Sequence, residues 1–116
     1  MITNVVVSYR VKPEAIAEHV RLIEGVFAQL HAERPDDVEY KVLRLADGAS
    51  FVHVSTADTA DGSNPLSELA AFKEFGRDIA ARVATTPDPT AADIIGSYYP
   101  PEPVSGSAGA GGPAAS

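Results

Sequence analysis

Residues 38–56 read VEYKVLRLADGASFVHVST, and this stretch decides the fold class. Two runs rich in strand-forming residues, 38–45 and 51–56, flank a segment that contains Asp47 and Gly48. An Asp-Gly pair between two strand-like runs is the strongest short-range indication of a β-hairpin. The stretch therefore predicts two antiparallel strands that are neighbours in one sheet.

A strand and a helix are predicted before the hairpin. Residues 3–11 are mostly β-branched or aromatic, and the run ends at Pro13, which cannot donate a hydrogen bond to a sheet. Proline suits the first turn of a helix, and apolar residues then recur at alternating spacings of four and three over residues 13–33. This apolar stripe consists of Ile16, Val20, Ile23, Phe27 and Leu30.

A second helix and a fourth strand are predicted after the hairpin. Asn64 and Pro65 supply an N-cap and a proline at the first helical position. Apolar residues at helical spacing predict one helix that ends near Thr85, and residues 90–99 read as the last strand. The buried stripe of this helix is predicted to contain Leu66, Leu69, Phe72, Phe75, Ile79 and Val83.

The element order β-α-β-β-α-β predicts an α+β, ferredoxin-like fold with an antiparallel sheet that carries its helices on one face. A chain of 116 residues has enough apolar content for one core, so residues 1–99 are predicted to form one domain. Residues 100–116 are mostly Gly, Ala, Ser and Pro, a composition that predicts a disordered tail.

Side chains alternate along each strand, which divides the sheet residues into two sets. We expect the mainly aliphatic set to pack under the helices; it contains Val5, Val7, Tyr9, Val11, Leu43, Leu45, Val52 and Val54. We expect the mixed set on the second face; it contains Val6, Ser8, Arg10, Tyr40, Val42, Arg44, Phe51, His53 and Ser55. With Ile94 this second face is too apolar to stay exposed, which predicts a homodimer with a barrel-like interior.

The charge and composition narrow the partners. The formal net charge is −7, so the positive surface that attracts nucleic acid or anionic membranes is not expected. No stretch approaches the roughly 20 apolar residues of a membrane span, and the start of the chain lacks a secretory signal, which predicts a cytoplasmic protein. The sequence has no cysteine, which excludes disulfides, thiolate nucleophiles and sulfur-ligated metals.

Over residues 4–99 the chain resembles the antibiotic-biosynthesis-monooxygenase-like family of the dimeric α+β barrel superfamily. The resemblance is carried by residues 5–14, 51–54, 66–75 and 96–98, which read VVVSYRVKPE, FVHV, LSELAAFKEF and GSY. It implies a small homodimer. Some members oxygenate phenolic or quinol-type aromatics with O2 and without metal or flavin, whereas others degrade haem.

The haem-degrading branch is disfavoured. Its pattern needs a core Trp and a His on the second helix, and this chain has no Trp and no His between Pro65 and Thr85. It also needs an Asn on the first strand, whereas Asn4 lies at the very start of that strand. We therefore expect no cofactor and no metal. His19 and His31 stand about 18 Å apart along one helix and are expected at the surface.

Oxygenation without a cofactor needs a dry pocket that favours the anion of an electron-rich phenol. An imidazole is a suitable base near neutral pH, which makes His53 the candidate catalytic residue. Candidate substrate-binding residues are Ser8, Tyr40, Arg44, Phe51 and Tyr98. The structural alternative is that His53 is a satisfied core residue and that the tyrosines are core or interface aromatics. Lys73, Arg77 and Arg82 are expected on a solvated helix face.

Two functions therefore remain open from the sequence. The first is a cofactor-independent monooxygenase that acts on a small electron-rich aromatic. The second is a non-catalytic dimeric module that binds a small apolar or aromatic ligand or serves a structural role. The orientation of His53 distinguishes them: a cavity beside Tyr40 and Ser8 favours the enzyme, and packing against the helices favours the binding module.

Overall fold

The predicted hairpin is present in the computed structural model, which describes residues 1–101. β2 (Val38–Arg44) and β3 (Ser50–Asp58) pair in antiparallel fashion. Gly48 has a φ of 77°, a left-handed conformation that glycine adopts without strain. The Asp47 side chain accepts hydrogen bonds from the backbone N–H groups of Ala49 and Ser50, two and three residues further along the chain, and so stabilises the turn.

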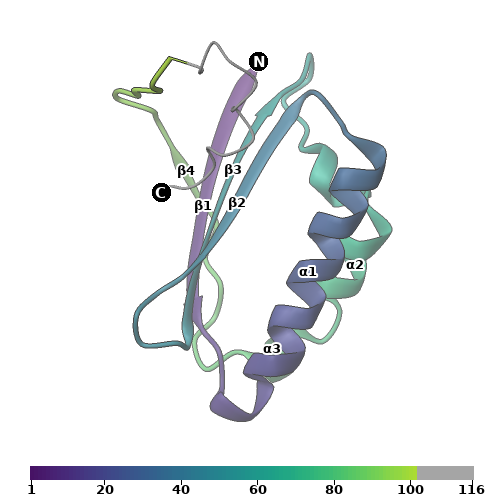
Figure 1. The fold of residues 1–116 in the computed structure, drawn as a ribbon, viewed down its shortest axis with the longest axis vertical. Coiled ribbons are helices and arrows are strands. Elements are labelled where there is room, and N and C mark those ends of the chain that lie inside the picture. Colours follow the sequence, from purple (N-terminus) through teal and green to yellow (C-terminus); the bar gives the residue numbers. More distant parts are fainter. Residues whose placement is uncertain (102–116) are drawn as a thin grey trace.

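The sheet has four strands in the order β2-β3-β1-β4, as the ferredoxin-like fold requires (Figure 1). β1 (Ile2–Arg10) lies between β3 and β4 (Thr90–Ala92). The predicted fourth strand, 90–99, is too long. Pairing with β1 ends where Ala92 lies opposite Asn4, although β1 continues to Ile2 beside β3.

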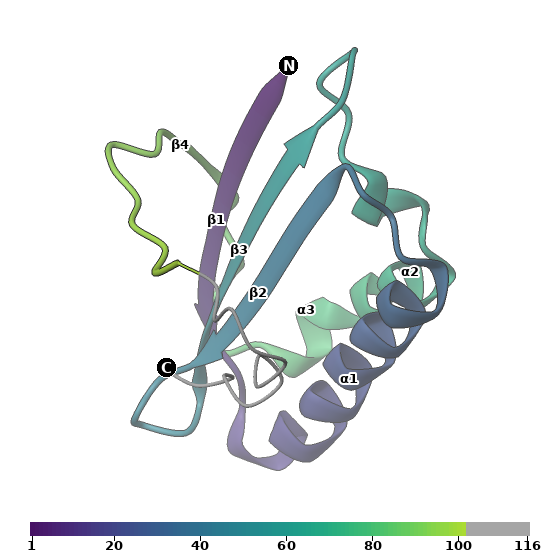
Figure 2. The same ribbon diagram turned by 45° about the horizontal axis from the view of Figure 1, so that its top comes forward.

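The helices lie on one face of the sheet (Figure 2). A short 3-10 helix, Pro13–Ala15, leads into α1 (Ile16–Glu33), which agrees with the predicted helix. The second predicted helix is instead broken into a 3-10 helix (Pro65–Glu68), α2 (Ala70–Gly76) and α3 (Ile79–Arg82). Leu69 and Arg77 are extended and Asp78 has a φ of 63°, so the helical hydrogen bonds stop at both places.

The strand register corrects the predicted assignment of the two sheet faces. His53 lies opposite Val7 on β1 and opposite Val42 on β2. Directly paired residues point to the same side of a sheet, so all three face the helices together with Tyr9 and Phe51. On β2 and β3 the mixed set therefore faces the helices, which is the opposite of the prediction. On β1 the two sets face the sides that were predicted.

The open face of the sheet carries the aliphatic residues that were expected in the core. Val52 lies opposite Ser8 and Leu43, and Val54 lies opposite Val6. Leu43 remains 46% exposed because no helix covers this side. Among residues 1–101, no helix has the length and apolar character needed to cross a bilayer. The predicted disordered tail, 100–116, falls almost wholly outside the described residues.

Candidate functional site

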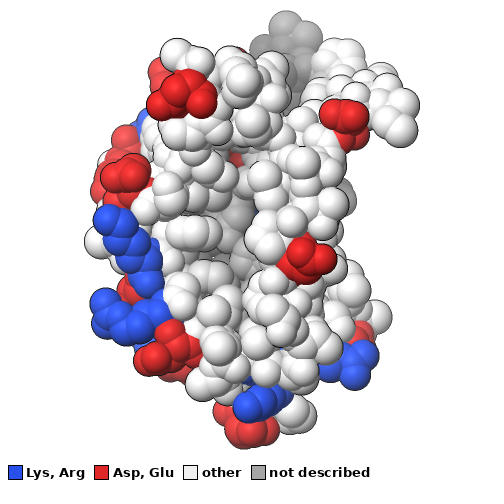
Figure 3. Space-filling view, turned by 180° about the vertical axis from the view of Figure 1, so that it is seen from behind, with Lys and Arg blue, Asp and Glu red and all other residues white. Residues whose placement is uncertain are grey.

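A cavity of about 230 Å³ lies between the sheet and the helices. Its walls are mainly apolar, and its polar groups come from Tyr9, Tyr40, His53, Ser55 and Asn64. The apolar lining residues are Val5, Val7, Leu66, Phe72, Phe75, Ile79, Pro87 and Pro89. Figure 3 shows a hollow on one face of the molecule, with most of the charged side chains toward the outer parts of that view.

The predicted site residues do not all meet in this cavity. His53 and Tyr40 line it together. Ser8 points to the open face of the sheet, because it pairs with Val52, and Phe51 is buried in the core without reaching the cavity. Arg44 is exposed at the end of β2, and Tyr98 is 82% exposed beyond the last strand.

Tyr40 and His53 belong to a continuous chain of hydrogen bonds. Tyr40 Oη lies 2.6 Å from His53 Nδ1, and His53 Nε2 lies 2.6 Å from Tyr9 Oη. Tyr9 Oη also lies 2.6 Å from His19 Nε2. Arg82 Nε closes the chain by donating to His19 Nδ1 over 3.1 Å. Five polar side chains from β1, β2, β3, α1 and α3 are thereby joined in an otherwise apolar core.

His19 is a correction to the predicted surface position. Its side chain is fully buried, with 0% exposure, and its ring packs edge-on against Tyr9 and Phe51. The sequence spacing could have indicated the buried position, since His19 lies three residues after Ile16 and four before Ile23, on the apolar side of the helix. His31 is exposed, as expected.

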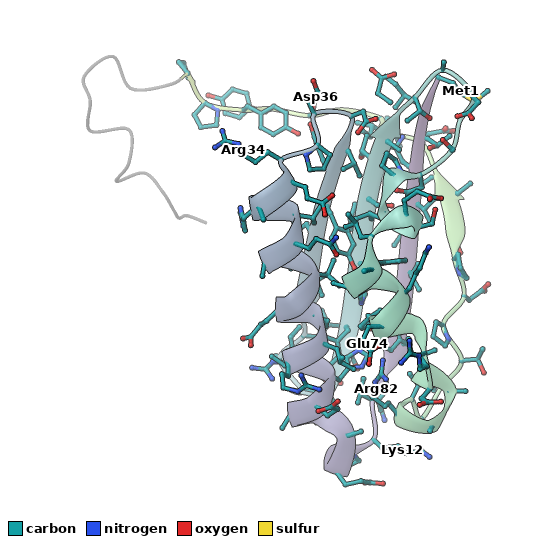
Figure 4. The ribbon with its side chains drawn as sticks, turned by 90° about the vertical axis from the view of Figure 1, so that its right-hand side faces the viewer. Met1, Lys12, Arg34, Asp36, Glu74 and Arg82 are labelled. Carbon is teal, nitrogen blue, oxygen red and sulfur yellow. The ribbon has the colours of Figure 1, made fainter. Side chains whose placement is uncertain are left out.

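Arg82 is also a correction, because it is only 8% exposed instead of belonging to a solvated face. Its guanidinium donates to the backbone oxygens of Phe75 and Arg77 and lies 5.4 Å from the centre of the Phe75 ring. These carbonyls are left without helical partners by the break after α2. Figure 4 shows Arg82 between α1 and the α2–α3 segment. Lys73 and Arg77 are exposed, as expected.

Burial keeps the two histidines and the two tyrosines of this hydrogen-bonded network uncharged, and only Arg82 carries a charge. Desolvation lowers the pKa of His53 to about 4, and desolvation with the nearby Arg82 charge lowers the pKa of His19 to about 4. Desolvation raises the pKa of the Tyr9 and Tyr40 hydroxyls well above the ordinary value. At neutral pH the site therefore contains two neutral imidazoles and two protonated phenols.

Fold and site together define a small ferredoxin-like α+β domain with a ligand-sized cavity between its sheet and its helices. This is the fold of proteins that carry the name antibiotic biosynthesis monooxygenase. A protein from Nitrosomonas europaea that has been assigned this name aligns with a TM-score of 0.67 and 17% identity, over 81% of this chain and 90% of that chain.

Two further solved structures share the fold. Rv0793 from Mycobacterium tuberculosis aligns with a TM-score of 0.69 and 13% identity over 85% of this chain and 100% of that chain. A protein from Caulobacter crescentus, also assigned by name to the antibiotic biosynthesis monooxygenases, has a TM-score of 0.66 and 19% identity over 82% and 91%. No protein-family model and no curated protein matches the sequence. The predicted resemblance is thus confirmed at the level of the fold.

Proposed function

We propose that this protein is a cofactor-independent monooxygenase that oxidises a small electron-rich aromatic, of the phenol or quinol type, with O2. The observation that carries the proposal is the pairing of Tyr40 and His53 at the wall of an apolar cavity. The names of proteins with the same fold support this reaction class. An apolar cavity also suits O2 and an aromatic ring, because both are poorly solvated by water.

The substrate supplies all the electrons in this reaction. A phenol and O2 give a quinone and water: one oxygen atom bonds to the ring carbon, and the other leaves as water with the phenolic hydrogen and the hydrogen of that carbon. The protein has to hold the ring and stabilise negative charge on the phenolic oxygen. The Tyr40 hydroxyl is the group we assign to that oxygen, and His53 fixes the position of Tyr40.

The role of His53 as the catalytic base stays a prediction. Both ring nitrogens of His53 lie 2.6 Å from a tyrosine hydroxyl, so a substrate proton reaches the imidazole only through one of those hydroxyls. We therefore propose that Tyr40 contacts the substrate and that His53 acts through its hydrogen bond to Tyr40.

Oxygen consumption tests the proposal with a panel of one-ring and two-ring phenols and quinols, together with the larger anthrones. Tyr40→Phe removes the hydroxyl and keeps the ring that stacks on Phe27. We expect this variant to lower the rate about 100-fold, as the loss of one donor to a developing oxyanion does. His53→Ala should also lower the rate strongly, whereas the exposed control His31→Ala should keep it. Equal rates in Tyr40→Phe and the unmodified protein would remove Tyr40 from the mechanism.

The alternative function is a non-catalytic module that binds a small apolar or aromatic ligand. It is favoured by the orientation of His53 toward the helices, with both ring nitrogens already engaged by tyrosines. In that case the protein binds aromatics from the same panel, and none of them gives oxygen consumption above the rate without protein.

We further propose that the working unit is a homodimer formed through the open face of the sheet. Val6, Val52 and Val54 lie on this face, and Leu43 beside them is largely exposed. Burial of these aliphatic side chains against a second copy removes them from water. Polar residues share the face with them, among them Ser8, Lys41 and Thr56. The dimer interface and the cavity then lie on opposite faces of the sheet, instead of sharing one surface as the sequence predicted.

A further inference from the structure

The buried guanidinium of Arg82 forms no ion pair with an acidic side chain among residues 1–101, although, after the hydrogen bond from Arg21, its charge is one of the smaller influences that lower the pKa of the exposed Glu18 carboxyl. The ion pairs in this part of the chain join Arg21 to Glu18, Arg77 to Glu74 and the N-terminus to Asp58. Arg82 instead donates to two backbone oxygens and to His19. A positive charge that is only 8% exposed and forms no ion pair is costly, which is consistent with a role toward a negatively charged ligand.

Arg82 also fixes the direction of every hydrogen bond in the chain. A guanidinium only donates, so His19 Nδ1 must accept and the neutral ring carries its hydrogen on Nε2. His19 Nε2–H then donates to the Tyr9 oxygen, and the Tyr9 O–H donates onward to His53 Nε2.

The same reasoning continues to the end of the chain at Tyr40. Because His53 Nε2 accepts, its hydrogen is on Nδ1 and donates to the Tyr40 oxygen. The Tyr40 O–H is left free to donate, and no hydrogen bond within the described residues uses it as a donor. Its hydroxyl therefore presents a proton, and not a lone pair, to a ligand in the cavity that it lines.

We infer that the cavity is an oxyanion site: it binds the ionised form of a small aromatic alcohol through the Tyr40 O–H, and Arg82 strengthens that donor through His19, Tyr9 and His53. Tyr40 contacts the ligand, and Arg82, His19 and Tyr9 act as positioning residues. The inference deepens the proposed function and depends on it for the choice of ligand class.

Two physical effects act in the same direction. Successive hydrogen bonds polarise one another, so each donation along the chain makes the next hydroxyl or imidazole a stronger donor. The Arg82 charge adds an attraction for an anion, and this charge already acts to lower the pKa of Tyr9, although burial outweighs it there. The other polar groups of the cavity, Ser55 and Asn64, are hydrogen-bonded to each other at 3.4 Å and carry no charge.

The size of the cavity limits the ligand. A cavity of about 150 Å³ in a protein core holds one benzene molecule. The volume here, about 230 Å³, is larger than that and below the range typical of drug-sized ligands. Aromatics of one or two rings therefore fit better than the three-ring anthrones, and a one-ring probe is the correct test molecule.

The test uses p-nitrophenol without oxygen, because its ionised form absorbs visible light and it is not an oxygenase substrate of the electron-rich class. The bound probe is titrated in the unmodified protein and in Tyr9→Phe, which cuts the chain in the middle and keeps the ring. We expect the pKa of the bound probe to be about one unit lower in the unmodified protein, which is a tenfold difference in the ionisation constant.

Two more variants separate the parts of the inference. Tyr40→Phe should raise the pKa of the bound probe at least as far as Tyr9→Phe does, because it removes the donor itself. Arg82→Gln retains a hydrogen-bond donor for His19 but removes the charge, and it should give an intermediate pKa. The exposed control Arg77→Gln should leave the pKa of the bound probe unchanged.

The inference is overturned if the bound probe has the same pKa in the unmodified protein and in Tyr9→Phe, or if the unmodified protein fails to bind the probe. If one of the variants Tyr9→Phe, Tyr40→Phe and Arg82→Gln fails to fold, the pKa of the probe bound to the other two still tests the inference. The outcome is independent of turnover, since no oxygen is present. A protein that lowers the probe pKa without consuming oxygen has the oxyanion site and lacks the proposed oxygenase activity.

Discussion

His19 shows at the scale of single residues how this core departs from an ordinary apolar one. A fully buried imidazole is tolerated here because both of its nitrogens have partners, Arg82 on one side and Tyr9 on the other. His53 is satisfied in the same way by two tyrosine hydroxyls. Such a network stabilises the fold only while the imidazoles remain neutral, which connects stability to pH.

We predict that the protein loses stability as the pH falls from 7 to 5. The folded protein holds the pKa of both histidines at about 4, whereas the unfolded chain protonates them near 6.5. The unfolded state therefore binds more protons in this window, so the free energy of unfolding decreases as the pH falls. We expect a loss of roughly 2 kcal/mol per histidine, measured by urea unfolding at the two pH values.

The matched controls are two other histidine variants. His31→Ala should retain the full pH dependence, because His31 is exposed. His19→Phe should lose about half of it, whatever its effect on stability at pH 7. Side-chain hydrogen bonds to Ser50 and Ser63 lower the pKa of Asp47 and Asp61, so these carboxylates titrate below the window. A free energy of unfolding that is the same at pH 7 and pH 5 would contradict neutral burial of the histidines.

At the scale of elements, α1 ends in a conformation that its sequence does not favour. Arg34 follows the last helical residue with φ 53° and ψ 53°, and its N–H donates to the Leu30 carbonyl. Glycine is the preferred residue at this left-handed position. We predict that Arg34→Gly raises the free energy of unfolding by about 1 kcal/mol, measured by urea denaturation. Arg34→Ala is the control and should give little or no gain, since it retains the Cβ atom.

The elements also show what could and could not be predicted from the sequence. Hydrophobic period and turn residues predicted the hairpin and α1, and they divided each strand correctly into two sets. They did not tell which set of one strand shares a side with which set of the next, because that depends on register. Assigning the aliphatic set of every strand to the core placed His53 on the wrong face, whereas its pairing with Val7 places it under the helices.

The candidate site was predictable in part for the same reason. Tyr40 and His53 were identified by residue type, and the structure brings them together. Arg82 could not be found, because its position depends on the break at Arg77 and Asp78, where the apolar spacing of the helix continues without interruption. A helix that ran on through these residues would not leave the two carbonyls to which Arg82 donates.

At the scale of the whole molecule, the two faces of the sheet differ in what packs against them. The helix face encloses the cavity and the hydrogen-bonded network from Arg82 to Tyr40. No helix of residues 1–101 covers the open face (Figure 1), which carries Val6, Leu43, Val52 and Val54 beside polar residues such as Ser8 and Lys41. The proposed dimer accounts for the position of the more aliphatic set of side chains outside the core of one copy. It also makes the two proposed activities, dimerisation and ligand binding, separable by mutation.

We predict that Val54→Lys converts the dimer to a monomer and leaves the ligand site intact. Val54 lies on β3, a strand with neighbours on both sides, opposite Val6 and Lys41 on the open face. A second copy would have to bury the new ammonium group next to the Lys41 side chain that already lies opposite this position, and burial of a second like charge costs more than the apolar contact contributes. Light scattering at micromolar concentration should give the mass of two chains for the unmodified protein and of one chain for the variant.

Thermal unfolding and ligand binding complete this test. The melting temperature of a dimer rises with protein concentration, because association stabilises the folded state, and this rise should disappear in Val54→Lys. Ala17→Lys adds the same charge on the exposed side of α1 and should remain dimeric. Since the cavity lies on the other side of the sheet, Val54→Lys should still bind p-nitrophenol. A variant that stays dimeric would move the interface away from the open face, and one that loses binding as it dissociates would mean that the second copy shapes the cavity.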